Sequence, residues 1–145
     1  MPSGSRVALV LGGGSLLNQV GRELATTLER QLAPFGVTAQ QAALLLHAGR
    51  EERTPSQLTA LLGTDTAGMT KLLDRLVDKG LLLRRPHPED RRAVVIELTE
   101  LGRALLPRLP PIFGRVTGQL LAGFTAEEID QLTTMLRRML VNLHT

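Results

Sequence analysis

The chain has 145 residues and a formal net charge of +3, and this length is enough for one domain that needs no disulfide or metal to complete its core. It contains no cysteine, which excludes thiol sensing and cysteine-ligated metals and fits a reducing, cytoplasmic environment. Three phenylalanines are its only aromatic residues and its apolar runs are too short to span a bilayer, so we expect neither single-stranded nucleic acid nor a membrane as a partner.

Residues 1–14 are expected to form an N-terminal arm, in which an apolar run ends at the triplet Gly12-Gly13-Gly14. Leu17 stands where a G-x-G-x-x-G phosphate loop needs its third glycine, and no Lys-Ser or Lys-Thr pair follows for a P-loop. We therefore favour a loose turn or break before a helix, and we predict no bound nucleotide or other cofactor. The arm also lacks the basic leader, apolar core and cleavage site of a signal peptide.

The next stretch is expected to form two helices. Apolar residues at helical spacing predict a first helix over residues 15–33, which the turn Pro34-Phe35-Gly36 ends. A capping box that begins at Thr38 opens a second helix, expected to continue to about His47. Residues 49–53 are then a charged loop or a short third strand.

Two shorter helices follow, joined by a tight turn. A cap at Thr54 opens the first of them, Gly63 closes it, and Gly80 ends the second. The apolar residues of the second helix have the spacing of one buried face: Met69, Leu72, Leu73, Leu76 and Val77. Its opposite face is small, hydroxylated or basic and suits a DNA major groove: Thr66, Gly68, Thr70, Lys71 and Arg75. Gly68 costs about 1 kcal/mol relative to alanine in a helix, and either permits close approach to DNA or has no role.

A β-hairpin with a charged tip comes next. Residues 81–85 and 93–98 are short apolar runs, and the segment 86–92 between them is expected to interrupt the strand. Four arginines surround this hairpin: Arg84, Arg85, Arg91 and Arg92. A solvated charged turn would explain them, but their position directly after a helix-turn-helix favours contact with phosphates and the minor groove, above all for Arg91 and Arg92.

The C-terminal part is helical but interrupted. Thr99 is expected to cap a helix that continues through Leu106, and Pro107, Pro110 and Pro111 then predict a bend or a break. A capping box at Thr125 opens a last helix with an apolar stripe, which one small chain alone leaves with too few partners.

Several short motifs together resemble the DNA-binding core of the MarR family of bacterial transcription regulators. They are Leu72-Leu73-Asp74-Arg75-Leu76, Lys79-Gly80-Leu81, Arg84-Arg85, Asp90-Arg91-Arg92 and Leu98-Thr99-Glu100-Leu101-Gly102. The resemblance implies a homodimer built from the first and last helices, and an ion pair through which Asp90 holds the basic side chains of the wing. It also implies a pocket for aromatic-acid-like effectors where the dimerisation helices meet the DNA-binding lobe.

The predicted fold is mostly α with a small β wing (α+β), namely a winged helix-turn-helix DNA-binding lobe plus a helical dimerisation lobe. In this division, residues 15–145 form one MarR-like domain. The winged helix-turn-helix core covers 37–106, and 15–36 together with 107–145 supply the dimerisation helices. The three prolines depart from the family pattern, which usually keeps this connection as one long helix.

The predicted function is a sequence-specific, double-stranded DNA-binding transcriptional regulator, a ligand-responsive repressor that binds a pseudo-palindromic operator as a homodimer. Two alternatives are a winged-helix architectural DNA-binding protein without an effector and a helical protein-interaction module. We do not expect an enzyme, because no nucleophile, base and orienting group share a recognisable spacing. His47, His87 and His144 are not clustered, so no metal site is predicted.

Overall fold

The computed structural model describes residues 9–10, 15–51 and 53–144. Most of the predicted N-terminal arm, and with it the glycine triplet, therefore lies outside the described residues. The helices are α2 (Leu16–Leu32), α3 (Ala39–Arg50), α4 (Pro55–Leu62), α5 (Thr66–Asp78), α6 (Glu100–Leu105), α7 (Pro110–Leu120) and α8 (Ala126–Leu143). Strands β1 (Leu82–Pro86) and β2 (Val94–Leu98) form an antiparallel hairpin. The predicted fold class, mostly helical with one small hairpin, is confirmed.

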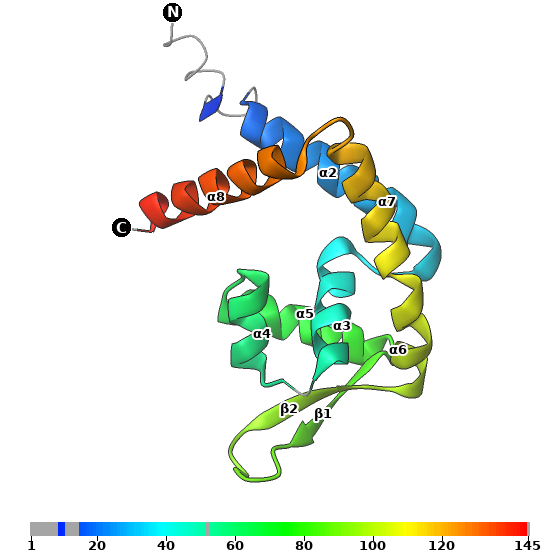
Figure 1. Cartoon of the computed structure of the whole chain (residues 1–145). Coiled ribbons are helices and arrows are strands. Elements are labelled where there is room, and N and C mark those ends of the chain that lie inside the picture. The colour runs from blue at the N-terminus through cyan, green and yellow to red at the C-terminus, as the bar shows by residue number, and fades with distance from the viewer. Residues whose placement is uncertain (1–8, 11–14, 52, 145) are drawn as a thin grey trace, which may run out of the picture.

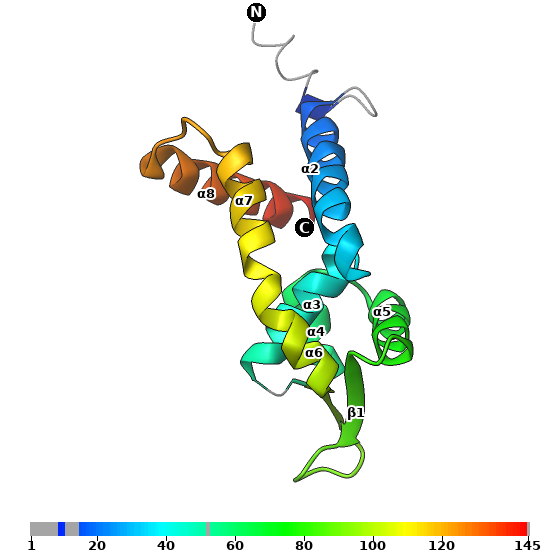
Figure 2. The ribbon, with the colours of Figure 1, turned by 90° about the vertical axis from the view of Figure 1, so that its right-hand side faces the viewer.

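The elements are arranged in two parts, which we name by their helices (Figure 1). The winged-helix lobe contains α3, α4, α5, α6 and the hairpin, and the long-helix lobe contains α2, α7 and α8. The hairpin projects beyond the helices of its lobe in both ribbon views (Figure 2). Among the described residues, no helix has both the length and the apolarity that crossing a bilayer would require.

The helix starts follow from side-chain caps, as the sequence predicted. Capping boxes form at Thr38 with Gln41, Thr54 with Gln57, and Thr125 with Glu128. In the second of these the Thr54 hydroxyl accepts the Gln57 N–H at 3.3 Å, and the Gln57 side chain accepts the Thr54 N–H at 2.9 Å. Each box satisfies two backbone donors that the first helical turn leaves unpaired.

The core is centred on α3 and continues into the long-helix lobe. Leu44 and Leu45 of α3 are fully buried with apolar residues of the neighbouring elements, namely Leu58, Met69, Leu76 and Ile96. Leu32 at the end of α2 and Leu109 and Ile112 near the start of α7 belong to the same buried cluster. The two lobes of one chain thus share a hydrophobic core rather than a solvated linker.

The ends of α3 and β1 differ from the sequence expectation. Helix α3 continues to Arg50 instead of stopping near His47. Strand β1 includes Pro86, which pairs with Val94, although we expected Pro86 to begin the turn. Proline is tolerated there because it is the last residue of an edge strand. Residues 49–53 were expected to form a charged loop or a short third strand. Gly49 and Arg50 instead end α3, and Arg53 forms an isolated bridge in which its carbonyl accepts the Ile96 N–H at 2.8 Å.

The predicted break at the prolines is confirmed. Helix α6 ends at Leu105, a 3₁₀ turn η3 covers Leu106–Arg108, and α7 begins at Pro110. A proline has no N–H to donate, so it fits the first turn of a helix better than its interior. The backbone stays in the right-handed helical region at Leu105, Leu106 and Leu109, and the chain therefore continues without reversing its direction (Figure 2).

The end of α5, the start of the hairpin and the start of α6 meet at a tight junction. The Thr99 N–H donates to the Leu81 carbonyl at 3.1 Å, and the Thr99 hydroxyl donates to the Gly80 carbonyl at 2.6 Å. The same hydroxyl accepts the Gly102 N–H at 3.0 Å and so caps α6. A Cβ atom on Gly102 would lie 2.3 Å from the Leu81 carbonyl oxygen, so no side chain fits at this position.

We predict that Gly102→Ala destabilises the chain by roughly 1–3 kcal/mol, because the clashing atom is a hydrogen-bonded backbone oxygen that has no alternative rotamer. The measurement is the free energy of unfolding in urea. Gly114→Ala is the matched control, since a Cβ there meets nothing within 4 Å and the substitution should be neutral or stabilising by up to about 1 kcal/mol. Equal effects of the two substitutions would contradict the role assigned to Gly102.

Candidate nucleic-acid interface

Helices α4 and α5 form a helix-turn-helix. Gly63 ends α4 in the left-handed conformation, with φ of 64°, and Asp65 caps α5. Of the five residues predicted for the buried side of α5, Met69, Leu72, Leu73 and Leu76 are buried, and Val77 is partly buried against the same core. The opposite side is exposed at the predicted groove-facing residues Thr66, Thr70, Lys71 and Arg75, while Gly68 is half-buried. The structure thus gathers small, hydroxylated and basic side chains along one open helix face.

Gly68 has a structural reason that we did not foresee from the sequence. Its N–H donates to the Asp65 carboxylate at 2.6 Å, and this hydrogen bond caps the N-terminus of α5. A Cβ atom at this position would lie 2.5 Å from the Thr64 hydroxyl and 3.0 Å from that carboxylate. The close approach that Gly68 permits is therefore to the cap of its own helix.

The arginines of strand β1 are paired with acidic side chains. Arg84 contacts Asp74 of α5 at 2.5 Å, and this ion pair links the hairpin directly to the exposed side of the helix. Arg85 contacts Glu97 of β2 at 2.5 Å, and Arg103 of α6 reaches the same carboxylate at 3.4 Å. These charges hold β1, β2, α5 and α6 in a common frame.

The Glu97 carboxylate is the centre of this charge network. Its pKa lies below the ordinary value of 4.5, mainly because Arg85 donates a hydrogen bond to the ionised form, with smaller contributions from the charges of Arg85 and Arg103 and an opposing effect of desolvation. A carboxyl with a lowered pKa stabilises the folded state above its ordinary pKa and loses this contribution as the pH falls through the lowered value. The network is therefore intact at neutral pH.

The hairpin tip is ordered by backbone hydrogen bonds. The His87 N–H donates to the Ala93 carbonyl and the Ala93 N–H to the Asp90 carbonyl, both at 3.1 Å. The Asp90 carboxylate accepts the Arg92 N–H at 3.0 Å. The expected ion pair between Asp90 and basic side chains of the wing is wrong, because the short Asp90 side chain turns back onto the backbone two residues further on. Asp90 shapes the tip through the main chain.

Arg91 and Arg92 lie at this tip and are exposed. Among the described residues, no carboxylate lies within ion-pair distance of either guanidinium. Arg84 and Arg85 are paired, whereas the two tip arginines present uncompensated charge to solvent. The two pairs of arginines that looked alike in the sequence are therefore electrostatically different.

Two cavities lie where the long-helix lobe meets the winged-helix lobe, the region in which a pocket was expected. The larger, of about 620 Å³, lies between α3 and the proline break and is lined by Leu46, His47, Arg50, Leu106, Pro107 and Pro110, among others. The smaller, of about 420 Å³, includes Phe35, Lys79, Leu101, Leu105 and Arg108. Lys79 lines the smaller cavity, although the sequence had singled it out only as part of the Lys79-Gly80-Leu81 motif.

No group of three or more His, Asp or Glu side chains within the described ranges is arranged to hold a metal ion. Three observations instead define the class of protein: a helix-turn-helix whose second helix exposes a basic face, a hairpin wing with two uncompensated arginines, and an ion pair between helix and wing. These features are those of a winged helix-turn-helix DNA-binding protein.

A family model described as MarR family matches residues 35–93. The multiple antibiotic resistance protein MarR of Escherichia coli (strain K12) is 33% identical over 129 residues, which cover 88% of this chain and 90% of that protein. The chain therefore belongs to the MarR family. This assignment rests on sequence over most of the length and agrees with the fold described above.

Solved structures give the same result. A mutant MarR of E. coli in complex with operator DNA matches with a TM-score of 0.79 and 30% identity, covering 92% of this chain and 97% of that one. A structure on the regulation of DNA binding of Bordetella bronchiseptica BpsR by 6-hydroxynicotinic acid matches with a TM-score of 0.76 and 24% identity, covering 86% and 89%. At that identity the second likeness shows the fold alone.

Proposed function

We propose that this chain is a sequence-specific regulator of transcription that binds double-stranded DNA and acts as a ligand-responsive repressor. The observation that carries the proposal is that one chain combines the exposed face of α5 with two uncompensated arginines at the hairpin tip, Arg91 and Arg92. The E. coli relative in complex with operator DNA supports it. A helical protein-interaction module would need neither feature.

The DNA-contacting roles divide between helix and wing. Lys71, Arg75 and Thr70 on α5 are placed to meet base edges and phosphates of a major groove. Arg91 and Arg92 contact phosphates or the adjacent minor groove, because a guanidinium is always charged and favours a narrow groove. Arg84 and Arg85 were also expected to contact DNA. Their ion pairs with Asp74 and Glu97 give them the role of setting the position of the wing.

We predict that Arg91→Ala lowers affinity for all duplexes alike and reduces the log–log salt slope by about one for each phosphate that the arginine neutralises in each subunit. Lys71→Ala and Arg75→Ala should also change sequence preference, because α5 faces the bases. The measurement is the duplex dissociation constant over a range of salt concentrations. Arg115→Ala, which removes an exposed charge on α7 far from the wing, is the control. Unchanged affinity in both Arg91→Ala and Arg92→Ala would remove the wing from the proposal.

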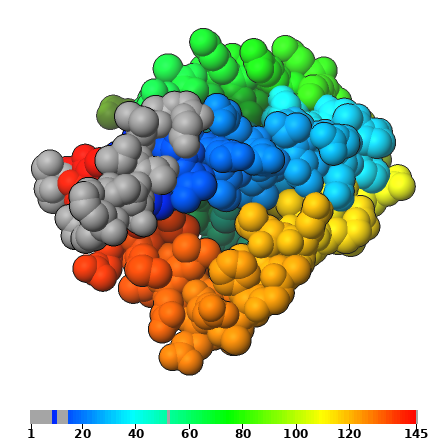
Figure 3. All heavy atoms as spheres, turned by 90° about the horizontal axis from the view of Figure 1, so that it is seen from above, coloured from blue at the N-terminus to red at the C-terminus, as the bar shows by residue number. Residues whose placement is uncertain are grey.

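We propose that the regulator is a homodimer formed through α2 and α8. No residue of α8 is buried, and its C-terminal half stands apart from the rest of the chain in Figure 1. Its stripe leaves large apolar side chains exposed: Leu136, Met139, Leu140 and Leu143. Leu16, Leu17 and Val20 of α2 are exposed as well, on a helix that lies beside α7 (Figure 3). A second copy covers both stripes in one helical interface.

The double substitution Leu136→Glu with Leu140→Glu is expected to convert the dimer to monomers and to weaken operator binding, because it places charges in the centre of the apolar stripe. Thr134→Glu, on the other face of α8, is the control and should remain dimeric. Sedimentation velocity measures the mass, and footprinting locates the site, where two half-sites should lie about 10 base pairs or a multiple of that apart. A monomeric wild-type chain protecting a single half-site would refute the dimer.

We further propose that the effector occupies the larger cavity. This cavity lies against the proline break, with Pro107 and Pro110 on one side and Leu46 of α3 on the other. Arg50 and His47 at its border are suited to the carboxylate of an aromatic acid. A ligand wedged at the break changes the position of one lobe relative to the other without unfolding either.

Benzoate and hydroxybenzoates are expected to weaken operator binding, and the operator should weaken binding of the acid by the same factor, because linkage is reciprocal. A coupling of about 1–3 kcal/mol corresponds to roughly 5- to 150-fold. Calorimetric titration with and without operator DNA measures both directions. Ala43→Phe, which fills the cavity, should abolish the response and leave binding to DNA intact. An acid that binds equally well to both forms is not the inducer.

A further inference from the structure

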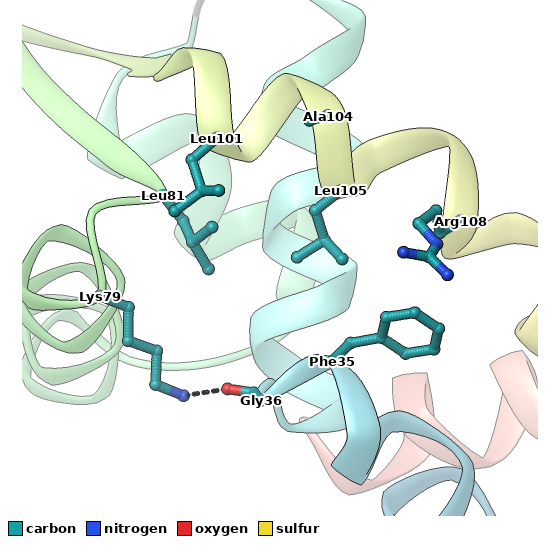
Figure 4. Close-up of a pocket in the computed structure, with 8 residues that line it drawn as sticks. All are labelled: Phe35, Gly36, Lys79, Leu81, Leu101, Ala104, Leu105 and Arg108. Carbon is teal, nitrogen blue, oxygen red and sulfur yellow. Dashed lines mark hydrogen bonds between the residues drawn. The ribbon is translucent and has the colours of Figure 1, made fainter.

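The smaller cavity is not used by the function proposed above. It lies between the end of α5 and the segment formed by α6 and η3, and Figure 4 shows the residues around it. Leu81, Leu101 and Leu105 point into it from one side, with Lys79 and the Phe35–Arg108 pair at its two ends. Its lining contains two cations and no acidic residue. The interior is therefore apolar and its border is positive.

The apolar lining includes a side chain that is costly to leave in water. Leu101 is 59% exposed, although it lies in the winged-helix lobe and outside the stripes assigned to dimerisation. Leu105 and Phe35 are only half-buried beside it. A ligand with an apolar body of a few carbon atoms would cover these groups, and burying them is favourable in proportion to the apolar area removed from water.

The cation at one end has a donor to spare. The Lys79 ammonium donates to the Gly36 carbonyl at 2.6 Å and to the Gln41 side-chain oxygen at 2.7 Å, both neutral acceptors. An ammonium has three N–H donors, so one is left for a ligand. No described carboxylate lies within ion-pair distance of Lys79, and its charge is therefore uncompensated.

The cation at the other end is held by an aromatic ring. The Arg108 guanidinium lies over Phe35, 4.9 Å from the ring centre, and none of the described carboxylates pairs with it. This contact fixes the side chain at the border of the cavity. Arg108 thus adds positive potential without a carboxylate partner, whereas Lys79 offers the direct hydrogen bond.

We propose that this cavity is a second ligand site, which binds a small amphipathic monocarboxylate. The carboxylate accepts from Lys79, and the apolar body lies on Leu81, Leu101 and Leu105. A hydrogen bond between two charged groups is stronger than one to a neutral carbonyl, so the anion competes with Gly36 and Gln41 for the ammonium. The cavity volume of about 420 Å³ accommodates an acid of this size.

The site has a direct connection to DNA binding, which rests on the proposed function. Lys79 is the C-terminal cap residue of α5, and its N–H donates to the Arg75 carbonyl at 3.0 Å. Its side chain ties this helix end to Gly36, in the turn between α2 and α3. A ligand that draws the ammonium away loosens α5, the proposed recognition helix, from that turn. The looser helix lowers affinity for the operator.

Calorimetric titration of the full chain with octanoate, without DNA, tests the site, and octanamide is the neutral control. Wild type, Arg115→Gln and Ala43→Phe should bind octanoate equally, since Ala43→Phe fills only the other cavity. Lys79→Gln should bind about tenfold or more weakly, and Arg108→Gln should weaken binding to a smaller extent, because it removes only potential. Leu101→Glu should abolish binding by placing a like charge in the cavity, and its exposure makes the substitution compatible with folding.

Four results would overturn the site: no octanoate binding by the wild type, equal binding of octanamide, unchanged binding in both Lys79→Gln and Leu101→Glu, or loss of binding in Ala43→Phe. In a second measurement octanoate should raise the operator dissociation constant of the wild type and leave that of Lys79→Gln unaffected. Binding of octanoate with unchanged operator affinity would overturn the coupling. A ligand-free chain that binds no DNA would overturn the proposed function instead, while the titration without DNA still decides the site.

Discussion

The arrangement of the winged-helix lobe depends on one backbone oxygen, the Leu81 carbonyl. It accepts the Thr99 N–H, and it lies so close to Gly102 that only a hydrogen atom fits between them. Because Leu81 follows α5 and precedes β1, and Thr99 caps α6, this contact joins the recognition helix, the wing and the helix that leads to the proline break. The start of α6 is therefore held against the end of α5 through backbone atoms rather than through flexible surface side chains.

The arginines that form ion pairs differ in role from those that do not: the paired ones hold structural elements in place, and the unpaired ones are available to bind DNA. Arg84, Arg85 and Arg103 each contact a carboxylate, on Asp74 or Glu97, and their charge holds secondary structure elements together. Arg91 and Arg92 have no such partner among the described residues and are exposed to solvent at the tip. Exposed ion pairs contribute little to stability, so their value here is geometric. The Arg84–Asp74 pair joins the hairpin to α5, and the two pairs at Glu97 join the strands to each other and to α6. Unpaired cations keep their full attraction for phosphate.

Features that depend on a few neighbouring residues were predictable from the sequence, and features that depend on tertiary contacts were not. The capping boxes at Thr38, Thr54 and Thr125 and the buried stripe of α5 are local, and each formed as expected. The partner of Arg84 is ten residues away on another element, and the Gln41 that receives Lys79 is thirty-eight residues away. The prediction of an ion pair at Asp90 failed for a different reason. The family resemblance suggested a basic side chain as its partner, whereas the short carboxylate accepts a backbone N–H two residues further on.

The prolines place both cavities on one short segment. Around η3, Leu105 and Arg108 line the smaller cavity, while Leu106 and Pro107 line the larger one. Neighbouring residues of a helical turn point in different directions, so the same few residues form a wall of each cavity. An uninterrupted α-helix resists bending because every turn is hydrogen-bonded to the next, but here the prolines leave donors missing where the two walls meet. A ligand in either cavity therefore contacts the segment at which the helical connection between the lobes is interrupted. The departure from one continuous helix thus places both cavities beside the same interrupted segment, so that either ligand can act on α5 through it.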